Sequence, residues 1–165
     1  ASDISAIPNI DTSSLSGGLL PTTNITYDIG SPTKKWNNLY ALNTYFGGIH
    51  EINLGHEGLN KIQEGTVLVL QNGILQPCEK ADDPLIMAVA ASGSNYPIVL
   101  GAEPVLVTGV VREGDYIITS NIKGHGKAVS PHYIYSKQLF GKIIAQAIES
   151  GKGKSHLIKA MIRKM

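Results

Sequence analysis

The stretch that decides the fold runs Thr66-Val-Leu-Val-Leu-Gln71, then Asn72-Gly73, then Ile74-Leu75. Two aliphatic runs flank an Asn-Gly pair, and Asn-Gly readily adopts the positive φ angles of a type I′ turn. The pattern therefore predicts a two-stranded antiparallel hairpin. Apolar runs of similar length follow it, so we expect β-structure to continue toward the end of the chain.

Six further apolar runs of strand length lie at 85–91, 97–101, 104–111, 115–119, about 138–149 and about 156–164. Turn-forming residues separate them, including Arg112-Glu-Gly114 and Gly151-Lys-Gly153. Together with the hairpin these runs make eight to ten short strands. We therefore predict a mainly β chain in which residues 49–165 form a β-sandwich or a barrel-like domain.

The final run mixes apolar and basic residues. Leu157, Lys159, Met161 and Arg163 alternate there with Ile158, Ala160 and Ile162. Because apolar residues occur at both parities, the pattern predicts a strand that is buried on both faces or lies at a sheet edge.

Composition excludes several classes of protein. The 165 residues are 42% hydrophobic and 16% charged, which argues against disorder of the whole chain. The sequence contains no run of 18 apolar residues, so it predicts no transmembrane helix and we expect no membrane partner. Residues 1–5 lack the basic and apolar regions of a signal peptide, which predicts synthesis in the cytoplasm. Cys78 is the single cysteine, and this excludes an intrachain disulfide.

The net charge of +1 hides an asymmetry. Residues 1–115 carry 12 acidic and five basic side chains, whereas residues 116–165 carry one acidic and nine basic side chains. The basic part could contact nucleic acid or another anionic surface, or the two parts could meet within one chain or between subunits. We favour the second interpretation, because the basic residues alternate with apolar ones. We therefore expect no nucleic-acid partner.

Residues 1–26 differ in composition from the rest of the chain. They are rich in Ser and Thr, contain no Lys or Arg, and carry aliphatic residues without a period. Such a segment cannot bury enough surface alone, so we expect an extended arm that becomes ordered when it binds a partner. A tail without a partner is the alternative. The candidate anchoring residues are Ile4, Ile7, Ile10, Leu15, Leu19 and Leu20.

Residues 27–48 are expected to form a module with one short helix and a strand. Ser31-Pro32 is a helix-start signal, with Ser31 as the N-cap and Pro32 at the first helical position. Leu39 and Tyr40 follow Trp36 by three and four residues, so the three side chains would share one helix face. Residues 41–46 are typical of an extended segment, which Gly47-Gly48 ends.

Motifs for covalent chemistry are weak. Gly153-Lys154-Ser155 matches only the end of a phosphate-binding loop, because the first glycine of that motif would fall at Ile148. Cys78 has the sequence neighbours of a small buried residue rather than of a nucleophile. Asp82-Asp83 precedes a proline and therefore indicates a turn rather than a carboxylate dyad.

Two His-Glu dipeptides, His50-Glu51 and His56-Glu57, suggest a metal hypothesis. On an extended strand the two histidines would lie about 20 Å apart. That is too far to share one ion unless Gly55 turns the chain. In a symmetric trimer, a single histidine near the threefold axis could also form a metal site, because the three copies would supply three ligands. We expect no metal, no cofactor and no catalytic residue, and hence a protein that is not an enzyme.

Two stretches resemble a known family. Asn24-Ile-Thr-Tyr-Asp-Ile-Gly-Ser-Pro-Thr-Lys-Lys-Trp-Asn-Asn-Leu-Tyr-Ala41 resembles the short module that recurs in bacteriophage tail-fibre and appendage proteins. Residues 101–120, with 140–149 and 157–165, are similar to the C-terminal domain of fibre-like structural proteins of cyanophages. They are more distantly similar to the C-terminal processing domains of some phage appendages, although no residue set matches an autocleavage site.

The resemblance implies a homotrimeric virion protein, either a head fibre or capsid decoration or a small tail appendage. The arm 1–26 would bind a capsid or tail protein, and the outer domain 49–165 would contact a glycan or protein of the host surface. A self-processing assembly domain that acts once on its own chain is the alternative, and a carbohydrate-binding module overlaps with the first interpretation. The expected trimer contacts are Tyr27, Ile29, Trp36, Leu39, Tyr40, Tyr45 and Phe46.

Overall fold

The computed structural model describes residues 29–31, 33–42, 47–133 and 138–165. The chain divides into two units, Ala1–Tyr40 and Ala41–Met165. All nine strands of the described residues belong to the second unit, so the prediction of a mainly β chain is confirmed. Within the same residues, no helix is long and apolar enough to cross a bilayer.

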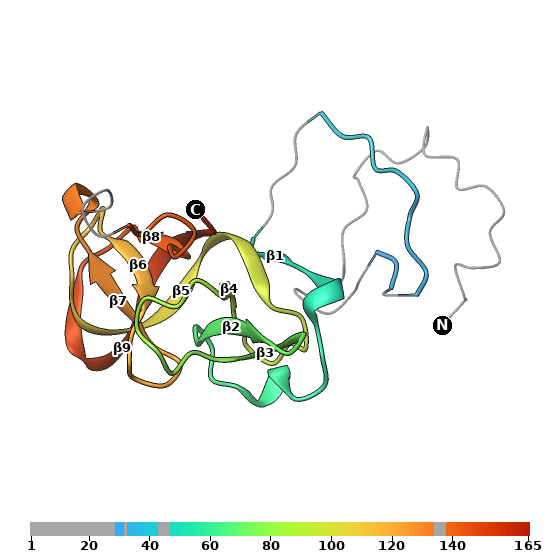
Figure 1. The fold of residues 1–165 in the computed structure, drawn as a ribbon. Helices are drawn as coiled ribbons and strands as arrows, with labels where there is room; N and C mark the ends of the chain where they lie inside the picture. The colour runs from blue at the N-terminus through green and yellow to red at the C-terminus, as the bar shows by residue number, and fades with distance from the viewer. Residues whose placement is uncertain (1–28, 32, 43–46, 134–137) are drawn as a thin grey trace, which may run out of the picture. The chain divides into compact units, whose positions relative to one another are not determined.

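A closed barrel of five strands forms the larger part of the second unit (Figure 1). Its strands are β5 (Ile98–Val111), β6 (Tyr116–Thr119), β7 (Gly126–Val129), β8 (Ala145–Ala147) and β9 (Gly151–Arg163). They are ordered β5-β7-β6-β8-β9, and the pairing of β9 with β5 closes the ring. The barrel, rather than the sandwich, is therefore the correct one of the two predicted architectures.

The longest ladder of the barrel joins β5 and β9. These strands have 14 and 13 residues, and they pair in antiparallel fashion from Leu100–Arg163 to Val111–Gly151. On the other edge of β5, β7 pairs in parallel, with Val107 opposite Gly126. At Val107, β5 is therefore paired with β7 on one edge and with β9 on the other.

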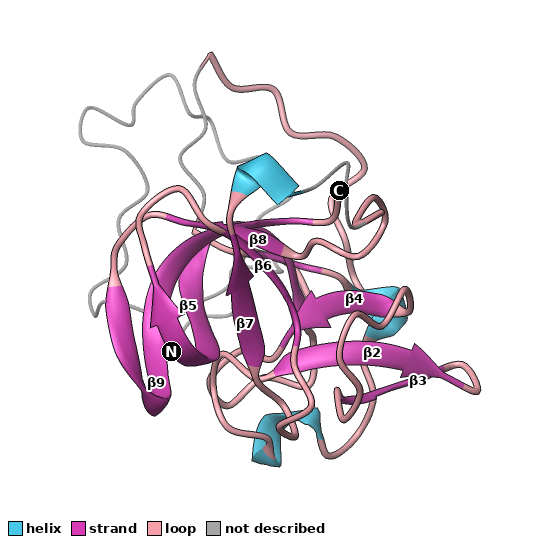
Figure 2. Cartoon of the chain, turned by 60° about the vertical axis from the view of Figure 1, so that its left-hand side comes forward, coloured by secondary structure: helices cyan, strands magenta, loops and turns pink. Residues whose placement is uncertain are grey.

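Four short strands extend the sheet from the N-terminal end of β5. β1 (Ile49–His50) and β4 (Ile86–Val89) pair with β5 directly. β2 (Val67–Gln71) and β3 (Ile74–Pro77) follow in the order β3-β2-β4-β5. Figure 2 shows β2, β3 and β4 on one side of β5, away from β9. β5 thus belongs to both the barrel and this outer sheet.

The predicted hairpin is confirmed. β2 and β3 pair through Leu70–Leu75 and Gln71–Ile74, which leaves Asn72-Gly73 as a two-residue loop. The φ angles of these two residues are 50° and 78°, both positive as a type I′ turn requires.

The interior of the barrel is filled by alternate side chains of its strands. On β9, Ile158, Ala160 and Ile162 are buried, whereas the residues between them are exposed. β9 is therefore buried on one face only, so the prediction of burial on both faces is wrong. Its second edge pairs with β8 at Ala160–Ile162, where the predicted edge position is also wrong, whereas the earlier residues of β9 have a ladder partner only in β5 among the described strands. The basic residues Lys159 and Arg163 mark its solvent face, and the apolar residues that share this face remain partly exposed.

Two predicted strand boundaries are also wrong. The runs 97–101 and 104–111 form one continuous strand, because Pro104 is accommodated in the ladder opposite Lys159. The run 138–149 contributes only the three residues of β8 to the sheet. Leu139 and Ile143 are buried but lie outside a strand, so apolar content alone did not distinguish a buried loop from a strand.

The predicted turn at Gly151-Lys-Gly153 lies inside β9, and the chain reverses at 148–150 instead. The two glycines make room for the ring of His156. A Cβ at Gly151 would lie 2.8 Å from His156 Nε2, and one at Gly153 would lie 3.3 Å from Nδ1. Both ring nitrogens are buried and have no hydrogen-bond partner in the described part of the chain. These two positions are therefore glycines because the His156 ring lies close to the backbone, and not because the chain reverses there.

Gly126 gives a test of the barrel packing. A Cβ there would overlap with Cγ2 of the fully buried Ile117 and lie 3.3 Å from the Ile118 oxygen. Gly126→Ala is therefore expected to lower the free energy of unfolding by about 1–3 kcal/mol, measured by urea denaturation. Gly47→Ala is the matched control, since its Cβ would meet Glu103 Oε1 at 3.5 Å. Equal stability of the two variants would contradict the packing.

Candidate functional site

A tight turn begins the described part of the first unit. The Ser31 N–H donates to the Lys34 oxygen at 2.9 Å, and the Lys34 N–H lies 3.0 Å from Ser31 Oγ. Gly30 precedes this turn with a φ of 89°, and a Cβ there would lie 3.0 Å from the Lys34 oxygen. The Gly-Ser pair of the fibre-like pattern is therefore used to form a turn.

The turn does not continue into a helix, so the predicted short helix is wrong for the described residues. Ser31 makes the expected cap-like bond to Lys34, but residues 35–42 are not helical. An isolated turn fixes several dihedral angles for one hydrogen bond, and a short helix needs an apolar face packed against a partner. Trp36, Leu39 and Tyr40 consequently do not share a helix face.

The apolar side chains of residues 29–42 are strongly exposed. The exposed fraction is 82% for Ile29, 73% for Trp36, 76% for Leu39, 90% for Tyr40 and 98% for Leu42. Single exposed apolar residues are ordinary on protein surfaces, but aromatic and aliphatic residues concentrated in one short segment are typical of interaction sites. We call these five residues the apolar segment and take it as the candidate functional site.

Four of the seven predicted trimer contacts belong to the apolar segment. Leu42 was not predicted, although its position next to Tyr40 and Ala41 continues the same run. The other predicted contacts and all the candidate anchoring residues lie outside the described residues: Tyr27, Tyr45, Phe46, Ile4, Ile7, Ile10, Leu15, Leu19 and Leu20.

The histidines of the two His-Glu dipeptides bind backbone carbonyls. His50 Nδ1 lies 3.1 Å from the Tyr96 oxygen. His56 Nδ1 lies 3.0 Å from the Glu57 oxygen, and its Nε2 lies 2.9 Å from the Leu75 oxygen in β3. In the part of the chain that the structure describes, no three His, Cys, Asp or Glu residues gather as a metal site would require. These two histidines instead fasten loops to strands.

Asp82 and Asp83 form the predicted turn. The Asp83 carboxylate accepts the Leu85 N–H at 2.8 Å, and Asp82 pairs with Lys127 at 2.9 Å. A second ion pair joins Lys123 to Glu79 at 2.7 Å. Both pairs connect the acidic part of the chain to the basic part, so the interpretation that the two parts meet within one chain is confirmed at these points. The four side chains are well exposed, so the pairs stabilise the fold only slightly.

A polar pair that the sequence analysis missed joins two segments 30 residues apart. His125, directly before β7, places Nε2 2.7 Å from the Oγ atom of Ser155 in β9. The other ring nitrogen, Nδ1, lies 2.7 Å from the Lys123 oxygen. No local signal could have revealed this contact, because it depends on β7 and β9 both flanking β5.

Comparison of the chain with protein-family models, curated proteins and solved structures gives no match.

Cys78 is fully buried, and its Sγ donates to the His125 oxygen at 3.3 Å. Burial raises the pKa of the Cys78 thiol to about 11. The thiolate fraction at neutral pH is then roughly 100-fold below that of an ordinary cysteine, so the native protein should react with a disulfide reagent at least that much more slowly than the urea-unfolded chain.

The raised pKa of Cys78 makes the free energy of unfolding depend on pH. Because the thiol pKa is raised in the folded state, its contribution to stability is present below pH 9 and is lost as the pH rises toward 11. Cys78→Ala should remove this part of the alkaline fall in unfolding free energy. Rapid labelling of the native thiol at neutral pH would contradict its burial.

Proposed function

We propose that this chain is a structural protein of a bacteriophage virion, a short homotrimeric fibre or spike that forms a head fibre or capsid decoration or a small tail appendage. The observation that carries the proposal is the apolar segment. Four of its five residues fall in the stretch that resembles the recurring fibre module, and among them Trp36 and Tyr40 are exposed to solvent in the single chain.

Exposure of these apolar side chains to water costs free energy, which burial between copies of the chain would remove. Burying a large apolar side chain contributes about 1.5–3 kcal/mol. Five such side chains in each copy would offset a large part of the entropy lost when short segments become ordered on association. A closed cyclic arrangement lets each segment contact two neighbours, and three copies is the number that the fibre resemblance implies.

The remaining parts of the chain suit this assignment. The aliphatic arm, residues 1–26, would bind a capsid or tail protein, and the barrel unit would face outward, where it could contact a host glycan or protein.

Substitution of Trp36 tests the trimer contact. In the single chain Trp36 is largely exposed, so Trp36→Ala should weaken association without lowering the melting temperature of the barrel. We expect at least a tenfold increase in the concentration at which the oligomer dissociates, measured by sedimentation equilibrium. Val110→Ala is the control, because Val110 is a similarly exposed apolar residue in β5. An unchanged oligomer in the Trp36 variant would contradict the assigned contact.

Removal of residues 1–26 tests the anchoring role. We expect the truncated protein to keep its oligomeric mass and its barrel but to be missing from assembled virions, measured by immunoblotting of purified particles. The full-length chain expressed at the same level is the control. Normal incorporation of the truncated protein would refute the anchor.

A further inference from the structure

We propose that Ser155 is an activated nucleophile that accepts acyl groups from carboxylic esters, with His125 as its general base. The proposal goes beyond the assembly role and does not depend on it. It starts from the 2.7 Å contact between Ser155 Oγ and His125 Nε2.

The partners of the imidazole decide the direction of this hydrogen bond. The Lys123 oxygen, 2.7 Å from Nδ1, can only accept, so Nδ1 carries the hydrogen. In the neutral ring Nε2 is then an acceptor, and Ser155 must donate its hydroxyl hydrogen to it. A nucleophile bonded to a base, with the base oriented by a third group, is the arrangement that activates serine in acyl transfer.

The base is held on a rigid support. The His125 oxygen accepts hydrogen bonds from the Ser120 N–H at 3.0 Å and from Ser120 Oγ at 2.8 Å, as well as the Cys78 thiol. Ser120 and Cys78 are both buried. The Gly124 N–H donates to the Cys78 oxygen at 2.7 Å. The loop is therefore fixed before any substrate binds, as efficient base catalysis requires.

The nucleophile lies at an irregularity of β9. The β5–β9 register shifts between Val107–His156 and Gly109–Gly153, so β9 carries one extra residue where Ser155 lies. A bulge of this kind redirects a side chain and often lies beside a functional site. Ser155 is exposed to solvent, and the neighbouring Lys152 and Lys154 are exposed too.

Ser155 Oγ attacks the ester carbonyl carbon and forms a new C–O bond, while its proton passes to His125 Nε2. The bond from that carbon to the alcohol oxygen breaks, and the proton on Nε2 passes to the departing oxygen. Water can then attack the acyl carbon and pass its proton to His125 Nε2, after which the bond from that carbon to Ser155 Oγ breaks and the proton returns to Oγ.

The test uses the full chain and p-nitrophenyl acetate. In the first turnover we expect each chain to release one nitrophenolate and form one acetyl-serine at Ser155, located by peptide mass spectrometry. Ser150 is an internal control in the same chain. It is also exposed, but its Oγ accepts the Glu113 N–H at 2.9 Å. Ser155 should be acetylated at least about 100-fold faster than Ser150.

Two variants complete the test. His125→Gln should lower acetylation at Ser155 about 100-fold or more, because the glutamine cannot take the proton. The His125 backbone holds the loop, so the melting temperature of this variant should change little. Ser155→Ala should abolish the acetyl-serine. Equal acetylation of Ser155 and Ser150 in the unmodified chain, or an unchanged rate in a folded His125→Gln protein, would overturn the proposal.

Discussion

The antiparallel ladder between β5 and β9 is the interaction on which the rest of the structure depends. It is the longest pairing among the described strands, and it alone closes the barrel, because the barrel strands otherwise form an open series from β5 through β7, β6 and β8 to β9. Closure removes the two exposed strand edges and buries the side chains of Val105, Ile158 and Ile162 from all sides. The outer sheet also depends on this ladder, since β1 and β4 pair with the N-terminal end of β5.

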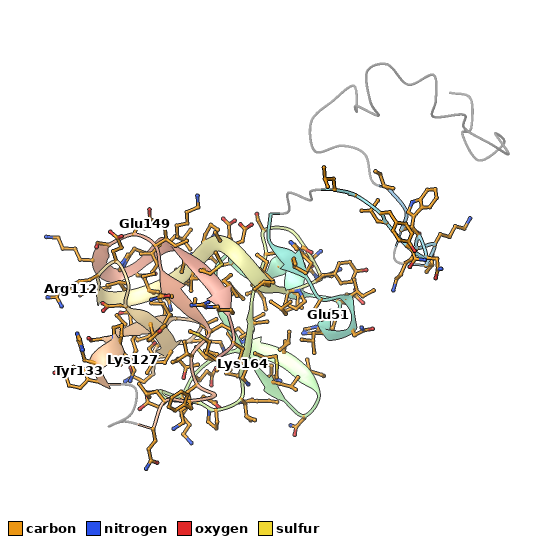
Figure 3. The ribbon with its side chains drawn as sticks, turned by 90° about the horizontal axis from the view of Figure 1, so that it is seen from above. Glu51, Arg112, Lys127, Tyr133, Glu149 and Lys164 are labelled. Carbon is orange, nitrogen blue, oxygen red and sulfur yellow. The ribbon has the colours of Figure 1, made fainter. Side chains whose placement is uncertain are left out.

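The same ladder positions the polar pair. At Val107, β5 is bordered by Gly126 of β7 and by His156 of β9. The residues directly before these two neighbours are His125 and Ser155, whose side chains meet at 2.7 Å where the register of β9 shifts by one extra residue. At the far end of the ladder, Arg112 directly follows β5 and Glu149 lies in the turn that leads into β9. Glu51 lies at the opposite side of the unit, next to β1 (Figure 3).

The parts of the fold that depend on local interactions could be predicted from the sequence. The β2–β3 hairpin follows from Asn72-Gly73, and the turn before β4 follows from Asp82-Asp83-Pro84. Closure of the barrel could not be predicted, because Val105 and Ile158 are 53 positions apart and no local pattern determines which strands pair. The glycines of β9 were misassigned for a different reason: Gly-Lys-Gly is typical of a turn, but here both glycines make room for the ring of His156 a few residues further along the same strand. The helix at Ser31 was expected from a cap that does form, but a cap alone cannot stabilise a helix without packing.

The candidate site could likewise be predicted only in part from the sequence. The apolar character of residues 29–42 is visible in the sequence, and the structure adds that these side chains are exposed in the single chain.

The most direct test of the assembly proposal is the native mass of the purified protein, measured by light scattering after size exclusion over a range of concentrations. The account predicts a mass three times that of the 17.6 kDa chain. A mass of one chain at every concentration would contradict it.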